Sequence, residues 1–228
     1  MKRNANKIVV VFLFLIGLTI LIYPKITNGL YNVKINKLEQ NYIATINNEN
    51  RDNLESLYEL LENENKKIFE DRQETFLNQK ISYEKTLIDL TSYGFDDNII
   101  GFLEIPSVHI KLPIYLGANA ENLKHGAVHL TGTSYPIGGI NTNSVIAAHR
   151  SYYKSLMFRN IDKIKIGDKL FIRNFNDILE YKAVKTDIIF PNDLNTITIV
   201  EGKDMVTIIS CHPYLVDNKR YVVYFERV

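Results

Sequence analysis

Apolar positions are densest at the start of the chain. Basic residues in the tail 1–7 precede an uncharged run from Ile8 to Pro24. As a helix this run would be about 25 Å long, near the lower limit for crossing a bilayer. A cleaved signal peptide is the alternative, but no small-x-small cleavage site follows the run. We therefore predict an uncleaved single-pass membrane anchor over 8–24, with a cytoplasmic tail and everything downstream exported.

Residues 25–97 are polar overall, with apolar residues at helical spacing. Two sets follow the i, i+3, i+4, i+7 rule closely enough to predict amphipathic helices. These sets are Leu38, Tyr42, Ile43 and Ile46, and Leu54, Leu57, Tyr58 and Leu61. The stretches "ITNGLYN", "NNENRDN" and "TSYGFDDN" predict breaks between helices. We expect the apolar side of this extracytoplasmic segment to pack against the domain that follows it or against a neighbouring helix, rather than to insert into the membrane.

From residue 98 to 228 the pattern changes to short β-rich runs separated by Gly, Pro, Asn and Asp. Eight such runs within this length favour a closed or nearly closed β-barrel. The runs are 99–106, 110–117, 127–133, 144–149, 169–174, 179–190, 205–211 and 221–228. The predicted fold is therefore mainly β, an eight-stranded barrel preceded by a transmembrane helix and a helical segment.

Composition and charge narrow the range of functions. The 228 residues are 46% hydrophobic, so a sizeable core can form, and the net charge is +1. The chain has no Lys/Arg-rich run that could hold a phosphate backbone, so nucleic acid is not an expected partner.

The chain has one cysteine, Cys211, at the end of an apolar run. Exported proteins usually pair their cysteines, so a lone thiol indicates either a reactive residue or a small buried side chain. His149 ends another run and Arg220 opens the last one. If these strands are neighbours, the thiol has an acid/base partner, and the guanidinium can favour the thiolate and bind a developing oxyanion. A structural histidine and a solvated arginine are the alternative interpretations.

Three segments together resemble a known family. They read "HLTGTSYPIGGINTNSVIAAHR", "NIDKIKIGD" and "MVTIISCHPYLVDNKRYVVYFER". They are similar to class C sortases, the pilus-building branch of the Gram-positive cysteine transpeptidases. The resemblance implies a sortase β-barrel that needs no metal or organic cofactor. It also implies that Cys211 is the nucleophile, His149 the acid/base and Arg220 the oxyanion-binding arginine.

The same resemblance implies the reaction. The substrate would be an exported protein with a C-terminal sorting signal similar to Leu-Pro-x-Thr-Gly, cleaved between Thr and Gly through a thioacyl enzyme. The acceptor would be a pilin lysine, or in wall-anchoring branches the amine of a peptidoglycan precursor. A thiol peptidase that transfers the acyl group to water and a non-enzymatic, surface-tethered β-domain are the alternatives.

Some features depart from the family pattern. Many class C members carry an Asp-Pro-aromatic lid before the barrel; here the place reads "SYGFDDNII". Phe95 or Asp96 could form an altered lid, but we expect no lid of that kind. His212 follows the nucleophile and points to the opposite face of its strand, so His149 is the better base.

Two candidate metal sites were also considered. A zinc site at His125 and His129 requires a helix that Gly126 interrupts. A calcium site at Asp193, Glu201 and Asp204 would rest on loop carboxylates that are usually only solvated. We therefore predict no metal site.

Overall fold

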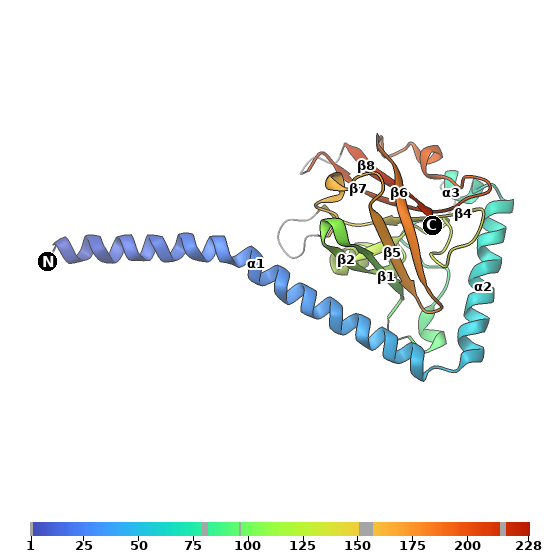
Figure 1. The fold of residues 1–228 in the computed structure, drawn as a ribbon, viewed down its shortest axis with the longest axis horizontal. Coiled ribbons are helices and arrows are strands. Elements are labelled where there is room, and N and C mark those ends of the chain that lie inside the picture. The colour runs from blue at the N-terminus through green and yellow to red at the C-terminus, as the bar shows by residue number, and fades with distance from the viewer. Residues whose placement is uncertain (1, 79–81, 96, 151–156, 215–217) are drawn as a thin grey trace.

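The computed structural model describes residues 2–78, 82–95, 97–150, 157–214 and 218–228. A long helix, α1 (Lys2–Asn48), leads from the N-terminus to a β-barrel, and α2 (Arg51–Glu70) runs back along the side of the barrel (Figure 1). Short helices follow at α3 (Glu74–Leu77) and α4 (Ala120–His125). Single 3₁₀ turns lie at Leu90–Tyr93, Pro106–Val108, Ile161–Lys163 and Leu194–Ile197.

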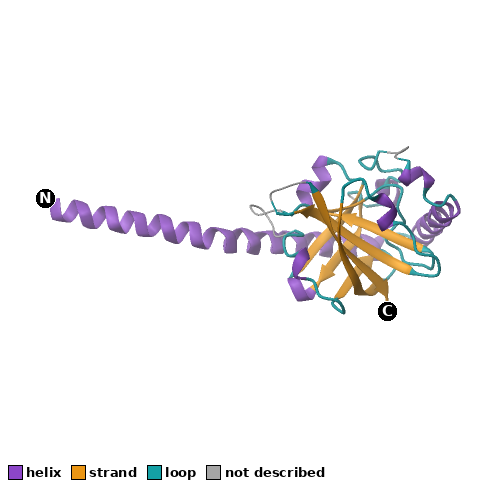
Figure 2. Ribbon diagram, turned by 90° about the horizontal axis from the view of Figure 1, so that it is seen from above, coloured by secondary structure: helices purple, strands orange, loops and turns teal. Residues whose placement is uncertain are grey.

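Helix α1 projects far from the barrel, as Figure 2 shows from a second direction. Side chains in its apolar part are exposed, and among the described residues this is the one helix long and apolar enough to cross a membrane by length and composition. The predicted break at "ITNGLYN" is wrong, because α1 continues through Gly29. One glycine costs a helix only about 1 kcal/mol, and packing of the next turns, where Ile35 is buried, offsets that cost.

The two predicted apolar stripes do pack against the barrel. On α2, Leu57 and Leu61 are fully buried, and on α1 Tyr42 is 6% exposed and donates its hydroxyl hydrogen to the Ile100 carbonyl at 2.8 Å. The predicted break between the helices is confirmed: α1 ends at Asn48 and α2 begins at Arg51.

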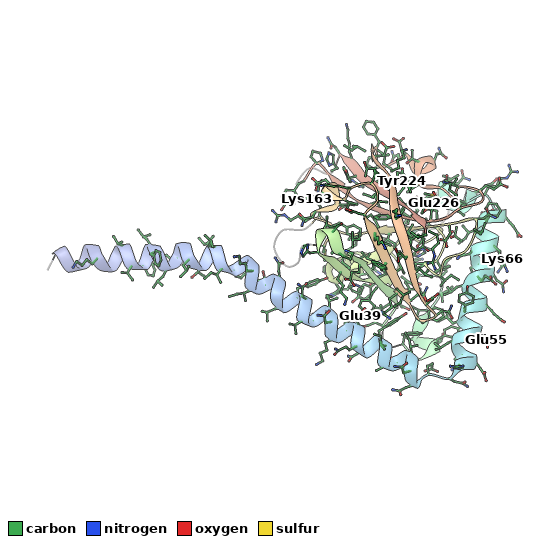
Figure 3. All side chains as sticks on the ribbon, in the orientation of Figure 1. Glu39, Glu55, Lys66, Lys163, Tyr224 and Glu226 are labelled. Atoms are coloured by element: carbon green, nitrogen blue, oxygen red, sulfur yellow. The ribbon has the colours of Figure 1, made fainter. Side chains whose placement is uncertain are left out.

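Charge also fixes α1 to the barrel. Glu39, labelled in Figure 3, lies where the helix passes the barrel wall. Its carboxylate pairs with Lys111 at 2.6 Å and with Arg173 at 3.3 Å, from two different strands. Because Glu39 is only 16% exposed, these two contacts are shielded from solvent more than ordinary surface ion pairs.

The eight predicted strands are all present. They are β1 (Ile99–Ile105), β2 (Ile110–Leu116), β3 (Ala127–His129), β4 (Thr142–Ala147), β5 (Lys169–Asn174), β6 (Ile178–Ile189), β7 (Asp204–His212) and β8 (Lys219–Arg227). They close into a barrel in the order β1-β2-β3-β4-β7-β8-β6-β5. The β2/β3 and β4/β7 pairs are parallel, and the other pairs are antiparallel.

Alternation along β7 and β8 divides their side chains between two apolar clusters. Val206 and Ile208 belong to the core that fills the barrel. Met205 and Ile209 alternate with them and belong to a second cluster on the outer face. We call this second cluster the outer floor. Its strand residues are Val145, Ile189, Met205, Ile209, Val222 and Tyr224, with Ala147 packed against them.

Candidate active site

The three predicted residues lie at or just beyond the ends of three adjacent strands, β4, β7 and β8. In the antiparallel β7/β8 ladder, Cys211 is the direct partner of Arg220. Residues directly opposite each other on paired strands project to the same face of the sheet. Cys211 follows Ile209 by two residues and Arg220 precedes Val222 by two, so both fall on the face that carries the outer floor.

His149 reaches the same face from β4. The parallel β4/β7 register pairs Ala147 with Ile209. It continues past the strand end, because the Ala148 amide donates to the Ile209 carbonyl at 3.3 Å and Ser210 Oγ donates to the Ala148 carbonyl at 2.8 Å. Extended by two residues beyond Ala147, the same register would align His149 with Cys211. The His149 side chain is exposed, and its carbonyl accepts a hydrogen bond from the Phe158 amide at 3.1 Å.

A second row of side chains lies on the opposite face of the same strand ends. Arg150 donates through Nη1 to His212 Nδ1 at 3.0 Å, and its Nη2 pairs with Asp162 at 2.5 Å. The His212 ring packs at 5.7 Å from the Tyr221 ring. His212 is therefore held by Arg150, which supports the prediction that it is not the base beside Cys211.

The outer floor is covered by a segment that the sequence did not predict to lie there. We call the described residues 73–78 and 82–83 the covering segment. Phe76, from α3, is 1% exposed and packs in the outer floor, with its ring 5.5 Å from that of Tyr83. Gln73 Oε1 accepts from the Ile199 amide at 2.6 Å, and the Tyr83 carbonyl accepts from the Ala118 amide at 2.7 Å. These two hydrogen bonds attach the covering segment to the rest of the domain at Gln73 and at Tyr83.

Phe95 is the aromatic candidate for an altered lid. Phe95 is 4% exposed, and its ring is 5.4 Å from that of Tyr42 and 6.3 Å from that of Phe175. These contacts hold it between α1 and the barrel. Asp96 lies outside the described residues.

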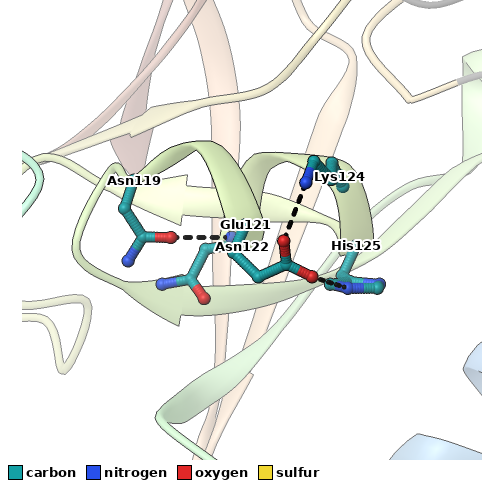
Figure 4. Close-up of polar contacts among 5 residues, drawn as sticks. All are labelled: Asn119, Glu121, Asn122, Lys124 and His125. Carbon is teal, nitrogen blue, oxygen red and sulfur yellow. Dashed lines mark hydrogen bonds and ion pairs between the residues drawn. The ribbon is translucent and has the colours of Figure 1, made fainter.

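The two histidines considered for zinc have separate partners. His125, at the end of α4, is exposed and pairs with Glu121 at 3.0 Å (Figure 4). His129 is 1% exposed, and its Nε2 lies 3.0 Å from the Ser134 carbonyl oxygen. Burial lowers the pKa of His129 to about 4. These contacts favour structural roles for both residues.

The acidic residues considered for calcium are likewise separate. Asp193 accepts from the Phe190 amide at 3.1 Å, whereas Asp204 is buried at the start of β7 and accepts from the Tyr181 hydroxyl at 2.9 Å. Burial raises the pKa of Asp204. Within the described ranges, no group of three or more His, Cys, Asp or Glu side chains is arranged to hold a metal ion.

Comparison with known proteins agrees with this arrangement. The family model for the sortase domain matches residues 103–228, which is more than half of the chain. The matched region covers most of the closed eight-stranded barrel, including the cysteine near the end of β7 that is paired with the arginine near the start of β8. The chain belongs to the sortase family, the family of cysteine transpeptidases.

Relatives matched by sequence are named sortase D and sortase A, whereas the structural neighbours are named sortase C. Sortase D of Bacillus subtilis is 33% identical over 56% of this chain, and the match spans 63% of the relative's own length, less than two thirds. Among solved structures, sortase C1 of GBS Pilus Island 1 is 27% identical with a TM-score of 0.71, over 83% of this chain and 90% of that one. Sortase C from Clostridium perfringens is 31% identical with a TM-score of 0.65, over 84% and 98%. The structural neighbours are thus class C sortases.

Proposed function

We propose that this chain is a membrane-anchored transpeptidase that cleaves a C-terminal sorting signal similar to Leu-Pro-x-Thr-Gly and transfers the acyl group to an amine, which we assign as a pilin lysine. What supports the proposal is the register of neighbouring strand ends: Cys211 and Arg220 are direct partners on β7 and β8, and His149 lies two residues beyond the end of β4, which pairs in parallel with β7. We call these three residues the catalytic row. The class C neighbours favour a pilin acceptor over a peptidoglycan precursor.

In this mechanism the Cys211 thiolate attacks the Thr carbonyl carbon of the sorting signal. Arg220 favours the thiolate and donates hydrogen bonds to the oxyanion as the tetrahedral intermediate forms. When the Thr–Gly bond breaks, His149 gives its proton to the departing Gly amine and a thioester to Cys211 remains. The acceptor amine then attacks the thioester, loses a proton to His149, and the thiolate leaves.

The outer floor suits an extended peptide that approaches this row. Its aliphatic side chains continue from the row along β4, β7 and β8, and can bury apolar side chains of the signal. The covering segment occupies the same floor, because Phe76 packs in it. In our proposal the signal binds after this segment has been displaced.

The anchor follows from the same assignment. We propose that residues 8–24 of α1 span the membrane with the tail 1–7 in the cytoplasm, because basic residues flank the apolar run on that side. The barrel would then face the cell wall, where exported substrates carry their sorting signals.

The test is a turnover assay with a sorting-signal peptide and a choice of amines. We expect the parent to release the Gly-containing fragment and to join the remainder to a lysine side chain of a pilin peptide, as identified by mass spectrometry. Cys211→Ala should abolish both products, and Arg220→Ala should reduce them at least about a hundredfold, the usual cost of losing an oxyanion donor. Arg173→Ala, an arginine away from the row, is the matched control.

The products also separate the alternatives. Transfer only to a peptidoglycan-precursor amine would replace the pilin assignment with wall anchoring. Release of free acid alone, whatever amine is offered, would indicate a thiol peptidase. Undiminished turnover by Cys211→Ala would refute the mechanism.

A further inference from the structure

Arg150 is an almost fully buried cation beside the proposed active site. Its side chain is 6% exposed and has three partners: Nη2 pairs with Asp162, Nη1 donates to His212 Nδ1, and Nε donates to the Arg159 carbonyl at 3.4 Å. Burying a guanidinium is costly unless each donor finds a partner, so this network fixes the position of Arg150 rather than leaving it adaptable.

The bond to Arg150 determines which nitrogen of the His212 ring accepts and which carries the proton. A guanidinium can donate hydrogen bonds but cannot accept them, so His212 Nδ1 is the acceptor and the proton of the neutral ring lies on Nε2. The other side of the ring packs on Tyr221, from β8. His212 is therefore held from β4 through Arg150 and from β8 through Tyr221.

Arg150 and His212 are each adjacent in sequence to a residue of the proposed active site. Arg150 directly follows His149, and His212 directly follows Cys211. The 3.0 Å bond joins the ends of β4 and β7 on the face opposite the catalytic row. We therefore expect a change in the separation of Arg150 and His212 to change the separation of His149 and Cys211, the residues that directly precede them.

We propose that Arg150 and His212 are positioning residues that set the distance between the Cys211 thiol and the His149 imidazole. The inference rests on the proposed function for its turnover test, but not for its test by alkylation. In this proposal they act without touching the substrate, by adding a side-chain link between the two strand ends beyond Ala147 and Ile209, the last residue pair of the β4/β7 ladder.

The experiment uses the full chain and three variants. Arg150→Met keeps the length and removes the donors, His212→Phe keeps a ring and removes the acceptor, and His212→Asn retains an acceptor oxygen. Arg173→Met is the control, since it removes an arginine that pairs with a carboxylate elsewhere. Thermal unfolding identifies any variant that is not folded, and only folded variants are compared.

In the turnover assay, we expect Arg150→Met and His212→Phe each to lower kcat at least about tenfold, since an ångström of misplacement can cost up to about a hundredfold. KM should change by less than about twofold because no binding contact is lost. The double variant should be no worse than the poorer single variant, since the two residues act as one unit. His212→Asn should recover most of kcat, and Arg173→Met should match the parent. Unchanged kcat in both single variants, or additive losses, would overturn the inference.

Alkylation by iodoacetamide separates this inference from the proposed function. Cys211 is the chain's one cysteine, so the reaction rate reports on that thiol alone. We expect Arg150→Met to slow alkylation several-fold at neutral pH, since the thiolate loses its imidazole partner, while His212→Asn reacts nearly as fast as the parent. If the parent turned over no sorting peptide, the proposed function would fail while this comparison still stood. Equal alkylation rates in parent and Arg150→Met would refute the positioning role.

Discussion

Phe76→Ala should weaken the fold and strengthen the activity at the same time. The ring is 1% exposed and packs in the outer floor. Truncating a buried Phe to Ala typically costs about 3–5 kcal/mol. Since α3 is one short turn fastened at the surface, we expect about 3 kcal/mol, lost mainly from the docking of the covering segment. At about 1.4 kcal/mol per factor of ten, the undocked population would rise roughly a hundredfold.

The assay is the specificity constant for a sorting-signal peptide, measured beside the unfolding temperature. If the covering segment must leave the floor first, kcat/KM rises as the undocked fraction rises, up to that hundredfold limit, mainly through a lower KM. Phe95→Ala is the matched control, because this buried Phe packs on Tyr42 between α1 and the barrel. The control should lose stability without gaining activity. A fall in stability with no gain in kcat/KM for Phe76→Ala would show that the segment does not restrict the substrate.

Three further predictions concern stability. Burial lowers the pKa of His129 to about 4, while an unfolded histidine titrates near 6.5, so the free energy of unfolding should fall by up to about 3 kcal/mol as the pH drops from about 6.5 to about 4. Urea unfolding of the parent and of His129→Gln at several pH values measures this loss. The same pH dependence of stability in both proteins would contradict the prediction. Burial raises the pKa of Asp204 above its ordinary 3.8, so the stability of the parent relative to Asp204→Asn should decrease as the pH rises from 3.8 through the folded pKa, the opposite of the trend for His129. Thermal unfolding of both proteins from acid to neutral pH measures this difference. A stability advantage of the parent that grows with pH would refute the raised pKa. Tyr42→Phe removes one buried hydroxyl that bonds the Ile100 carbonyl and should cost about 1 kcal/mol in urea unfolding, with no change in kcat if the contact only attaches α1 to the barrel.

The barrel could be predicted from the sequence because its strands are local patterns. Each strand is a short run bounded by turn residues, and eight such strands in about 130 residues favour a sheet that closes into a barrel. Cys211, His149 and Arg220 stand at the ends or starts of such runs, where side chains emerge from the sheet. The parallel β4/β7 pairing is a non-local contact that the sequence patterns did not predict, and the roles of the three residues stay a prediction from the resemblance to sortases.

Features decided by competition between distant segments could not be predicted. Gly29 indicates a break, but contacts of the following turns with the barrel outweigh its low helix propensity. Phe76 is an isolated aromatic residue in a polar stretch, and only the outer floor shows where it packs. The bond between Arg150 and His212 joins side chains 62 positions apart, each of which follows a residue with a stronger chemical signal.

If residues 8–24 span the membrane as proposed, the continuous course of α1 links that span directly to the barrel. The helix has 47 residues, about 70 Å at about 1.5 Å each, and Tyr31 already bonds the barrel through the His125 carbonyl at 3.1 Å. Adding one residue to the stretch 25–30 would turn the barrel by about 100° and lift it by about 1.5 Å. Adding seven would restore its heading at a height about 10 Å greater. In a membrane-anchored chain, the direction in which the proposed active site faces would therefore depend on the number of residues between the membrane span and the barrel.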